Sequence, residues 1–397
     1  MPRPIRAVIH LDNLRHNLAR MKAAAPHARV WAVVKANAYG HGIAHAFDAF
    51  RAADGFALLD LDEARRIRAM GWRGPILLLE GAFEARDLEL CSRLDLWHTV
   101  HCNEQIDWLA AHKTQVAHRV FLKLNSGMNR LGFMPDAFRA AWTRLNALTQ
   151  VDEISLMTHF SDADGERGIA HQVAAFERAT HDLAGARALC NSAATLRHAT
   201  APLAGEGQHG QLSADWVRAG IALYGSAPDF PQGSAQSWGL LPGMTLKSEL
   251  LAVQHLQPGD TVGYGSTFTA EHAMHIGVVA CGYADGYPRH APGHNAADTP
   301  VLVDGIRTRL VGRVSMDMLT VDLDPVIAQR GAIPAMGTEV VLWGRSSRGA
   351  VLCTDDVALS AQTIAYELVC AVAQRVPVEV ERADRLMGAH MYRLQPL

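Results

Sequence analysis

The stretch WAVVKANAYGHG, residues 31–42, joins an apolar run to a lysine that is followed by small residues, a tyrosine and two glycines. The apolar run predicts an inner strand, and Lys35 stands at its carboxyl end. Lysines are seldom buried unless they are paired or used chemically. The end of this strand is therefore the first place to look for both the fold and the site.

Seven more apolar runs follow along the chain, and helical patterns such as residues 60–71 and 171–185 lie between many of them. Strands that alternate with helices predict parallel β/α units. Eight units over about 215 residues predict a (β/α)₈ barrel, a fold that typically takes about 250 residues. The eight predicted strands are residues 29–34, 55–60, 75–80, 96–100, 119–125, 153–160, 186–192 and 217–225.

The pattern changes after residue 225, where residues 227–243 are rich in Pro, Gly and Ser and predict a linker. β-branched runs separated by Gly, Pro and Asp follow, which is typical of an antiparallel β domain. One helix is predicted over residues 354–374, with Thr354 as its N-cap.

We therefore predict an α/β protein with two domains. Residues 1–235 would form a TIM-like barrel, whose first residues could pack on the other domain. Residues 236–397 would form a mainly antiparallel β domain.

Composition narrows the class of protein. Of the 397 residues, 49% are hydrophobic and 19% charged, the formal net charge is −3, and there is no long basic block. We therefore expect neither nucleic acid nor an anionic membrane as the main partner. The six cysteines form no C-x-x-C pair, and the N-terminal stretch lacks the apolar core of a signal peptide, so we expect a reduced, cytoplasmic protein. His41 and His45 lack a third ligand, so no metal site is predicted.

A lysine at the carboxyl end of a barrel strand can form a Schiff base with an aldehyde, including that of pyridoxal phosphate. A lone lysine that ends a strand and points to solvent is the simpler alternative. The motif KANAYGHG, however, resembles the pyridoxal-lysine signature of the alanine racemase family. The resemblance continues, in the family's order, through KLNSGMNRLGF (123–133), THF (158–160), CNSAAT (190–195), VRAGIALYG (217–225), VGYGSTF (262–268), GYADGYPR (282–289), GRVSMDM (312–318) and IAYELVC (364–370).

The resemblance implies a homodimer that interconverts L-alanine and D-alanine with two proton-carrying groups, one on each face of the substrate Cα. Lys35 would serve one face, and Tyr264 would reach the other from the partner subunit. A tyrosine loses its proton only near pH 10 in water, so positive charge must support it. The family provides this through a chain that maps to Tyr264, His159 and Arg218, in which the arginine faces the pyridine nitrogen and keeps its own proton.

The same resemblance assigns the remaining site residues. The substrate carboxylate would meet Arg130 and the Met316 backbone N–H, with Asp317 nearby. Lys123 has two interpretations, a carbamate that orients Arg130 or an unmodified lysine in a salt bridge. The residues expected to hold the cofactor are Lys35, Tyr39, His159, Asn191, Ser192, Arg218, Gly220, Ile221 and Tyr366.

Three alternatives stay open. A racemase of broader specificity, or one for serine, would differ only in its pocket. A related barrel decarboxylase would not need Tyr264 as a second base. A pyridoxal phosphate carrier would resemble the barrel alone and lack residues 236–397. Sequence does not distinguish supply of D-alanine, for instance to a cell wall, from its breakdown.

Overall fold

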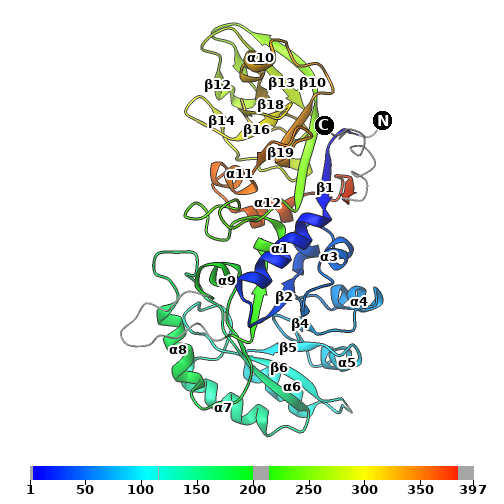
Figure 1. Cartoon of the computed structure of the whole chain (residues 1–397), viewed down its shortest axis with the longest axis vertical. Coiled ribbons are helices and arrows are strands. Elements are labelled where there is room, and N and C mark those ends of the chain that lie inside the picture. The colour runs from blue at the N-terminus through cyan, green and yellow to red at the C-terminus, as the bar shows by residue number, and fades with distance from the viewer. Residues whose placement is uncertain (1–2, 115, 200–213, 383–397) are drawn as a thin grey trace, which may run out of the picture.

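The computed structural model describes residues 3–114, 116–199 and 214–382, and eight parallel strands in it form a closed barrel. Each strand overlaps one of the eight predicted apolar runs and is shorter than it, so the barrel prediction is confirmed. Figure 1 shows the barrel as the lower half of the molecule. The strands are β2 (Arg29–Val33), β3 (Gly55–Leu58), β4 (Ile76–Leu78), β5 (Trp97–Val100), β6 (His118–Lys123), β7 (Val151–Met157), β8 (Arg187–Ala188) and β9 (Trp216–Ala219).

Helices join the strands and pack around the barrel, as apolar residues at helical spacing require. In helix α4, for example, Ala64 and Ile67 are buried and Asp60 caps the first turn. The helices of this half are α1 (Leu11–Ala24), α2 (Lys35–Tyr39), α3 (Ile43–Ala49), α4 (Leu61–Ala69), α5 (Asp87–Arg93), α6 (Asn103–Ala111), α7 (Pro135–Asn146), α8 (Ala170–Thr180), α9 (Ser192–His198) and the 3₁₀ turn η1 (Ile221–Tyr224).

Aromatic side chains fill the barrel near the amino ends of its strands. The rings of Trp31 and Trp216 stack with centroids 4.2 Å apart, and Trp97 meets Trp31 edge-on at 5.7 Å. Val33 lies two residues beyond Trp31 and therefore points to the same side of the strand. It lines a cavity at the carboxyl end. The barrel is thus filled by side chains near the amino ends of its strands and has a cavity at their carboxyl ends.

The second half contains a nine-stranded sheet in which the pairings are antiparallel except one, so the predicted β domain is confirmed. Strand β1 (Arg6–His10) pairs with β10 and, in parallel, with β21, so the chain begins in this sheet before it enters the barrel. Figure 1 shows β1 and β10 running side by side between the two halves. The other strands of the sheet are β10 (Met244–Leu256), β13 (Met274–Val279), β16 (Pro300–Val303), β17 (Ile306–Arg309), β18 (Leu319–Asp322), β19 (Glu339–Arg345), β20 (Val351–Leu352) and β21 (Val378–Glu381).

Smaller elements complete this half. Helix α10 (Asp324–Arg330) follows β18, and two hairpins stand apart from the large sheet. The hairpins and two 3₁₀ turns are β11 (Thr261–Val262) with β12 (Phe268–Thr269), β14 (Gly293–His294) with β15 (Ala297–Asp298), η2 (Tyr264–Ser266) and η3 (Tyr283–Asp285).

The single helix predicted over residues 354–374 is wrong. The structure has two short helices, α11 (Thr354–Ser360) and α12 (Ala365–Ala371), and Thr354 is the first residue of α11 rather than its cap. Gln362 between them has a φ of +55°, a left-handed conformation that ends a right-handed helix. The break turns α12 toward the barrel. In the described part of the chain, no helix is both long and apolar enough to cross a bilayer.

Candidate active site

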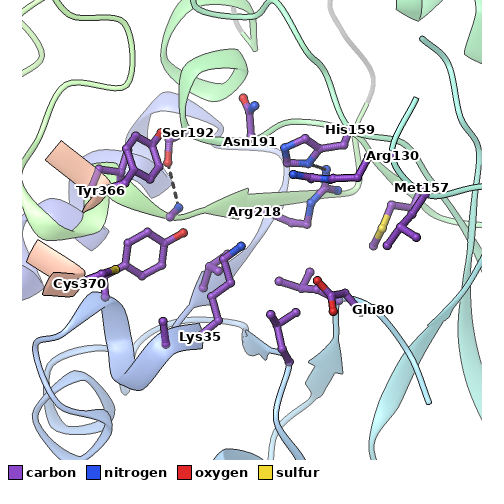
Figure 2. Close-up of a pocket in the computed structure, with 18 of the residues that line it drawn as sticks. Lys35, Glu80, Arg130, Met157, His159, Asn191, Ser192, Arg218, Tyr366 and Cys370 are labelled. Carbon is purple, nitrogen blue, oxygen red and sulfur yellow. Dashed lines mark hydrogen bonds between the residues drawn. The ribbon is translucent and has the colours of Figure 1, made fainter. Parts of the chain in front are cut away.

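A cavity of about 420 Å³ lies at the carboxyl ends of the barrel strands, beside helix α12. Figure 2 shows Lys35 and Glu80 reaching into it from one side, and Arg130, His159 and Arg218 from the other. Eleven of the fourteen predicted site residues line this cavity: Lys35, Tyr39, Lys123, Arg130, His159, Asn191, Ser192, Arg218, Gly220, Ile221 and Tyr366.

Lys35 begins an unusual turn. The four residues after it, 36–39, have φ between +51° and +56°, so the chain makes a short left-handed helical turn. Such a turn costs roughly 1–2 kcal/mol per residue for L-amino acids, and small side chains suit it best. Asn37 holds the turn, because its side-chain oxygen accepts a hydrogen bond from the Ile43 N–H at 3.0 Å and its own N–H donates to Glu63 at 2.6 Å.

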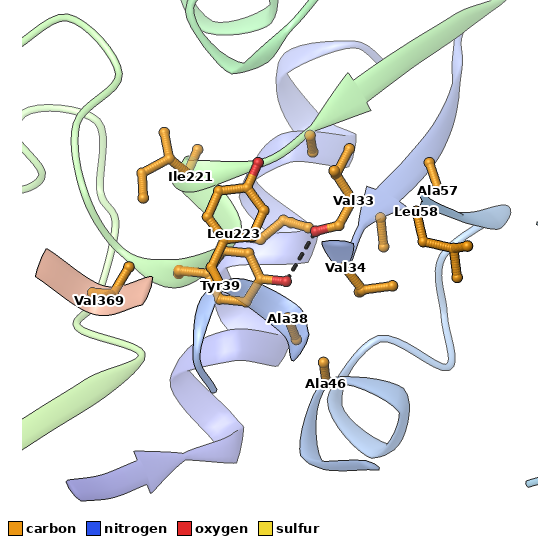
Figure 3. Close-up of a cluster of buried hydrophobic side chains, with 14 of the residues drawn as sticks. Val33, Val34, Ala38, Tyr39, Ala46, Ala57, Leu58, Ile221, Leu223 and Val369 are labelled. Atoms are coloured by element: carbon orange, nitrogen blue, oxygen red, sulfur yellow. Dashed lines mark hydrogen bonds between the residues drawn. The ribbon is translucent and has the colours of Figure 1, made fainter. Parts of the chain in front are cut away.

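Gly40 explains why a glycine closes the turn. Its φ is +77°, and a Cβ placed there would lie 2.1 Å from the carbonyl oxygen of Val369 in α12. The barrel loop and the second-domain helix therefore meet backbone to backbone. Figure 3 shows Val369 beside Tyr39 and Leu223 in this junction. The motif KANAYGHG thus positions the lysine and joins the two halves of the molecule at the pocket.

Hydroxyl and backbone groups form a polar cradle at one end of the cavity. Ser192 Oγ accepts a hydrogen bond from the Gly220 N–H at 2.9 Å, and a Cβ on Gly220 would lie 2.7 Å from the Tyr39 hydroxyl. The rings of Tyr39 and Tyr366 are 6.2 Å apart. Burial raises the pKa of both phenols, so each keeps its proton and can donate to an anion. Asn191 caps helix α9 by accepting from the Ala194 N–H.

Arg218 is anchored by the backbone. Its guanidinium donates to the carbonyl oxygens of Ala188 at 2.6 Å, Thr158 at 2.7 Å and Leu189 at 3.0 Å. Burial lowers the pKa of Arg218 to about 10, so it stays charged at neutral pH. Its Nη2 lies 3.4 Å from His159 Nδ1, and burial together with this cation holds the pKa of His159 well below its usual value. A neutral histidine therefore stands beside a fixed cation.

The pKa values of the two pocket lysines are both lowered, which favours the neutral amine. Burial, followed by the charge of Arg130, lowers the pKa of Lys35. Burial, Arg218 and Arg130 lower the pKa of Lys123 to about 8. Glu80 opposes both shifts, and it is the only acidic side chain among the described residues that line the cavity. The pocket therefore has a surplus of positive charge and suits an anionic ligand.

Sequence reasoning gave no role to Glu80, Met157 or Cys370, which also line the cavity. Glu80 had a usable signal, because it ends the apolar run 75–80 at the carboxyl side of a barrel strand, where barrel enzymes place functional groups. Cys370 had a weaker one: it follows Tyr366 by four residues and so shares its face of the helix.

The other three predicted residues do not join the cavity of their own chain. Tyr264, in the 3₁₀ turn between β11 and β12, is 70% exposed, and Met316, in the turn before β18, is 53% exposed. Asp317 forms ion pairs with Arg3 and Arg375. These residues lie on the second domain, with side chains open to solvent or held by neighbouring cations.

Comparison with known proteins shows which family this chain resembles. Residues 9–228 match the model of the alanine racemase N-terminal domain, and residues 243–380 match that of the C-terminal domain. The alanine racemases of Polaromonas sp. (strain JS666) and Paracidovorax citrulli are 68% and 67% identical over 381 residues, which cover 96% of this chain and the whole of each relative.

Solved structures agree with the sequence relatives. The biosynthetic alanine racemase from Pseudomonas aeruginosa has a TM-score of 0.86 at 42% identity, and the alanine racemase from Acinetobacter baumannii has 0.84 at 34%; both cover 96% of this chain and all of their own. The two domain models match in the expected order, and these relatives are matched along their whole length. The chain belongs to the alanine racemase family.

Proposed function

We propose that this isomerase interconverts L-alanine and D-alanine, with pyridoxal phosphate bound at Lys35 and each active site shared between two copies of the chain. The observation that carries the proposal is the division of the predicted site: eleven residues line one cavity, while Tyr264 and Met316 are exposed on the other domain. A site divided in this way is complete only when a second copy supplies the exposed groups.

The cavity suits pyridoxal phosphate in size and in its donors. Ligand pockets commonly measure about 300–1,000 Å³, and this one falls within that range. The cradle of Tyr39, Ser192, Gly220 and Tyr366 would hold the phosphate, and Lys35 would bond to the aldehyde carbon. When bound, the cofactor supplies an electron sink for the charge left on Cα after its proton is removed. Arg218 would face the ring nitrogen and keep its own proton.

Two groups would move the proton, one on each face of the substrate. Lys35 is suited to the first, because its lowered pKa makes the neutral amine more available at neutral pH. Tyr264 of the partner subunit would serve the second. The pair formed by His159 and Arg218, at 3.4 Å, would place positive charge next to that tyrosine and favour its phenolate.

Arg130 and the Met316 backbone N–H would bind the substrate carboxylate, the arginine from the same chain and Met316 from the partner. We favour a carbamate on Lys123 over an unmodified lysine. Its pKa of about 8 leaves a fraction of neutral amine to react with CO₂ at neutral pH, and the negative charge formed would offset the neighbouring arginines.

The chirality of recovered alanine tests the reaction. Purified, cofactor-loaded protein is incubated with L-alanine and, separately, with L-serine, and the products are separated on a chiral column. We expect D-alanine to form quickly. D-serine should form more slowly but still measurably, because replacing a methyl by a hydroxymethyl group costs about 1–3 kcal/mol of binding. Equal rates would favour a racemase of broader specificity. Formation of a decarboxylated amine instead would contradict the proposal.

The state of Lys123 has its own test. Crystals grown with bicarbonate at about pH 8 should show the atoms of one CO₂ bonded to Lys123 Nζ, and a Lys123→Met variant should not. A map with a plain lysine paired to a carboxylate would establish the salt-bridge interpretation.

The domain boundary and the location of the protein stay predictions. The family models end at residue 228 and resume at residue 243, which is compatible with a domain boundary at 235 and 236. Residues 383–397 of the second predicted domain lie outside the described residues. The cytoplasmic location stays a prediction.

A further inference from the structure

Asp317 belongs to a group of four charged residues that links distant parts of the chain. Arg375 donates to Asp317 Oδ1 at 2.7 Å and to Asp285 Oδ1 at 2.7 Å. Arg3 lies 3.2 Å from Asp317 Oδ1 and 3.1 Å from Asp285 Oδ2. Two arginines therefore bridge two aspartates. We call Arg3, Asp285, Arg375 and Asp317 the four-residue ion network.

Asp285 is the buried centre of this network. Its side chain is only 1% exposed, so its charge has to be neutralised by partners. Besides the two arginines, it accepts a hydrogen bond from the Gly282 N–H at 2.9 Å, and its carbonyl accepts one from Ala373, just after α12. The network is therefore anchored in the packed interior of the second domain.

The network also holds the turn of residues 315–318. Arg3 donates to the carbonyl of Asp317 at 2.7 Å, while Tyr283 and Ala284 donate to the carbonyls of Ser315 and Met316 at 3.0 Å each. Among the described residues, no group accepts a hydrogen bond from the Met316 N–H. The turn is thus fixed on its carbonyl side, while the Met316 N–H, like that of Asp317, has no acceptor in the described part of the chain.

The charge of Asp317 makes a direct contact with the substrate carboxylate unfavourable, because like charges repel. Bound by Arg3 and Arg375, the aspartate can instead act through the turn that it holds. Arg375 lies four residues beyond α12, the helix whose Tyr366 and Cys370 line the cavity of the same chain. The same arginine therefore joins the turn to the wall of the pocket.

Resting on the shared site of the proposed function, we propose that Asp317 is a positioning residue. Held by Arg3 and Arg375, it fixes the 315–318 turn so that the Met316 N–H meets the substrate carboxylate in the second copy's pocket. Through Arg375 it also ties that turn to helix α12 of its own pocket.

The test compares Asp317→Asn with a matched control, Asp304→Asn. Asp304 also lies between two arginines of the second domain, Arg330 at 2.7 Å and Arg348 at 2.5 Å, but outside the network. In cofactor-loaded protein, Asp317→Asn should raise the KM for L-alanine about tenfold and change kcat by less than about threefold, the size expected for one hydrogen bond to a charged group. Asp317→Glu should recover part of the loss, and Asp304→Asn should leave KM unchanged.

Binding of two fragments separates positioning from simple damage. Propionate carries the carboxylate without the amine, and ethylamine carries the amine without the carboxylate; the Kd of each is measured by calorimetry. We expect Asp317→Asn to weaken propionate about tenfold and to leave ethylamine unchanged. Equal weakening of both fragments, unchanged propionate binding, or an equal loss in Asp304→Asn would each overturn the proposal. These measurements need no racemase activity, so failure of the proposed function would be seen separately, as wild-type protein that forms no D-alanine.

Discussion

The barrel pocket and the exposed face of the second domain differ in how completely one chain accounts for their side chains. In the pocket, Arg218 is anchored by three carbonyl oxygens and Ser192 is bonded to Gly220. On the exposed face, Tyr264 is 70% open to solvent and its turn belongs to a small hairpin apart from the large sheet. The pocket side chains are held by hydrogen bonds within the chain, whereas Tyr264 points into solvent.

The exposed face carries the group that the proposed chemistry needs and that the pocket of the same chain does not hold, the Tyr264 phenol. At 70% exposure, Tyr264 packs little against its own chain. In the proposed function this exposed ring contacts another molecule, the Lys35 pocket of a second copy of the chain. Under that proposal, Tyr264 and Lys35 are the two halves of one site.

Removing each half of the proposed shared site, and then mixing the two variants, should change racemase activity more than any other test. Lys35→Ala and Tyr264→Phe should each lower turnover about 10³-fold or more, as loss of a catalytic base does. Mixed and allowed to exchange subunits, half of the dimers should contain one copy of each variant, and one of their two pockets would have both groups. Racemase activity of the mixture should then rise to about one quarter of the wild-type value.

A second mixture supplies the control. Lys35→Ala combined with Arg218→Leu should not recover, because both residues belong to the pocket of their own chain and every pocket would lack one of them. No recovery in the first mixture, with subunit exchange verified by native mass spectrometry, would place Tyr264 outside the shared site.

Most of the fold followed from periodicity, and the errors lie where packing decides. The run 217–225 was predicted as a strand, yet only Trp216–Ala219 is one, and residues 221–224 form a 3₁₀ turn whose side chains are also buried. An apolar run predicts that residues are buried, and the strand and the 3₁₀ turn are both buried, so the run cannot distinguish them. The break at Gln362 likewise has no local signal, since its left-handed conformation goes with the packing of α12 against the barrel.

The site was predictable as a list of residues and not as an arrangement. The motifs identified eleven residues that converge in the cavity, because the carboxyl ends of barrel strands meet by construction. No pattern could place Tyr264 relative to Lys35, since that distance depends on how the two domains pack and, in the proposed dimer, on how two copies meet. Glu80 lacked a motif, and only the folded barrel brings its charge next to Lys35 and Lys123.

The junction of the two regions at Gly40 can be tested through the free energy of unfolding. Gly40→Ala combines a φ of +77° with a Cβ 2.1 Å from the Val369 carbonyl, so it should destabilise the protein by about 3 kcal/mol and weaken cofactor binding. Gly71→Ala is the matched control: its φ is +96°, but nothing lies within 4 Å of its Cβ position, so only about 1 kcal/mol should be lost. Urea unfolding and cofactor titration measure both. Equal losses would mean that contact with α12 contributes nothing.

The pH dependence of stability should also differ between the two regions, because the barrel half contains a buried pair of histidines. His98 Nε2 and His118 Nδ1 share a hydrogen bond of 3.1 Å inside the barrel half, with Ser92 and the ring of His112 as further neighbours. Burial, with the neighbouring histidines, lowers the pKa of His98 to about 3 and that of His118 to about 4.

Because the unfolded chain binds these protons at about pH 6.5, the stability that both histidines contribute is complete above that pH and is lost as the pH falls toward 4. Between pH 7 and pH 5 the loss should be about 2 kcal/mol for each histidine. His118→Gln should lessen the loss by about 2 kcal/mol in urea unfolding followed by tryptophan fluorescence, whereas His181→Gln, at an exposed histidine, should leave it unchanged. Similar acid sensitivity in His118→Gln and wild type would mean that the His98–His118 pair contributes nothing to the acid response of the barrel.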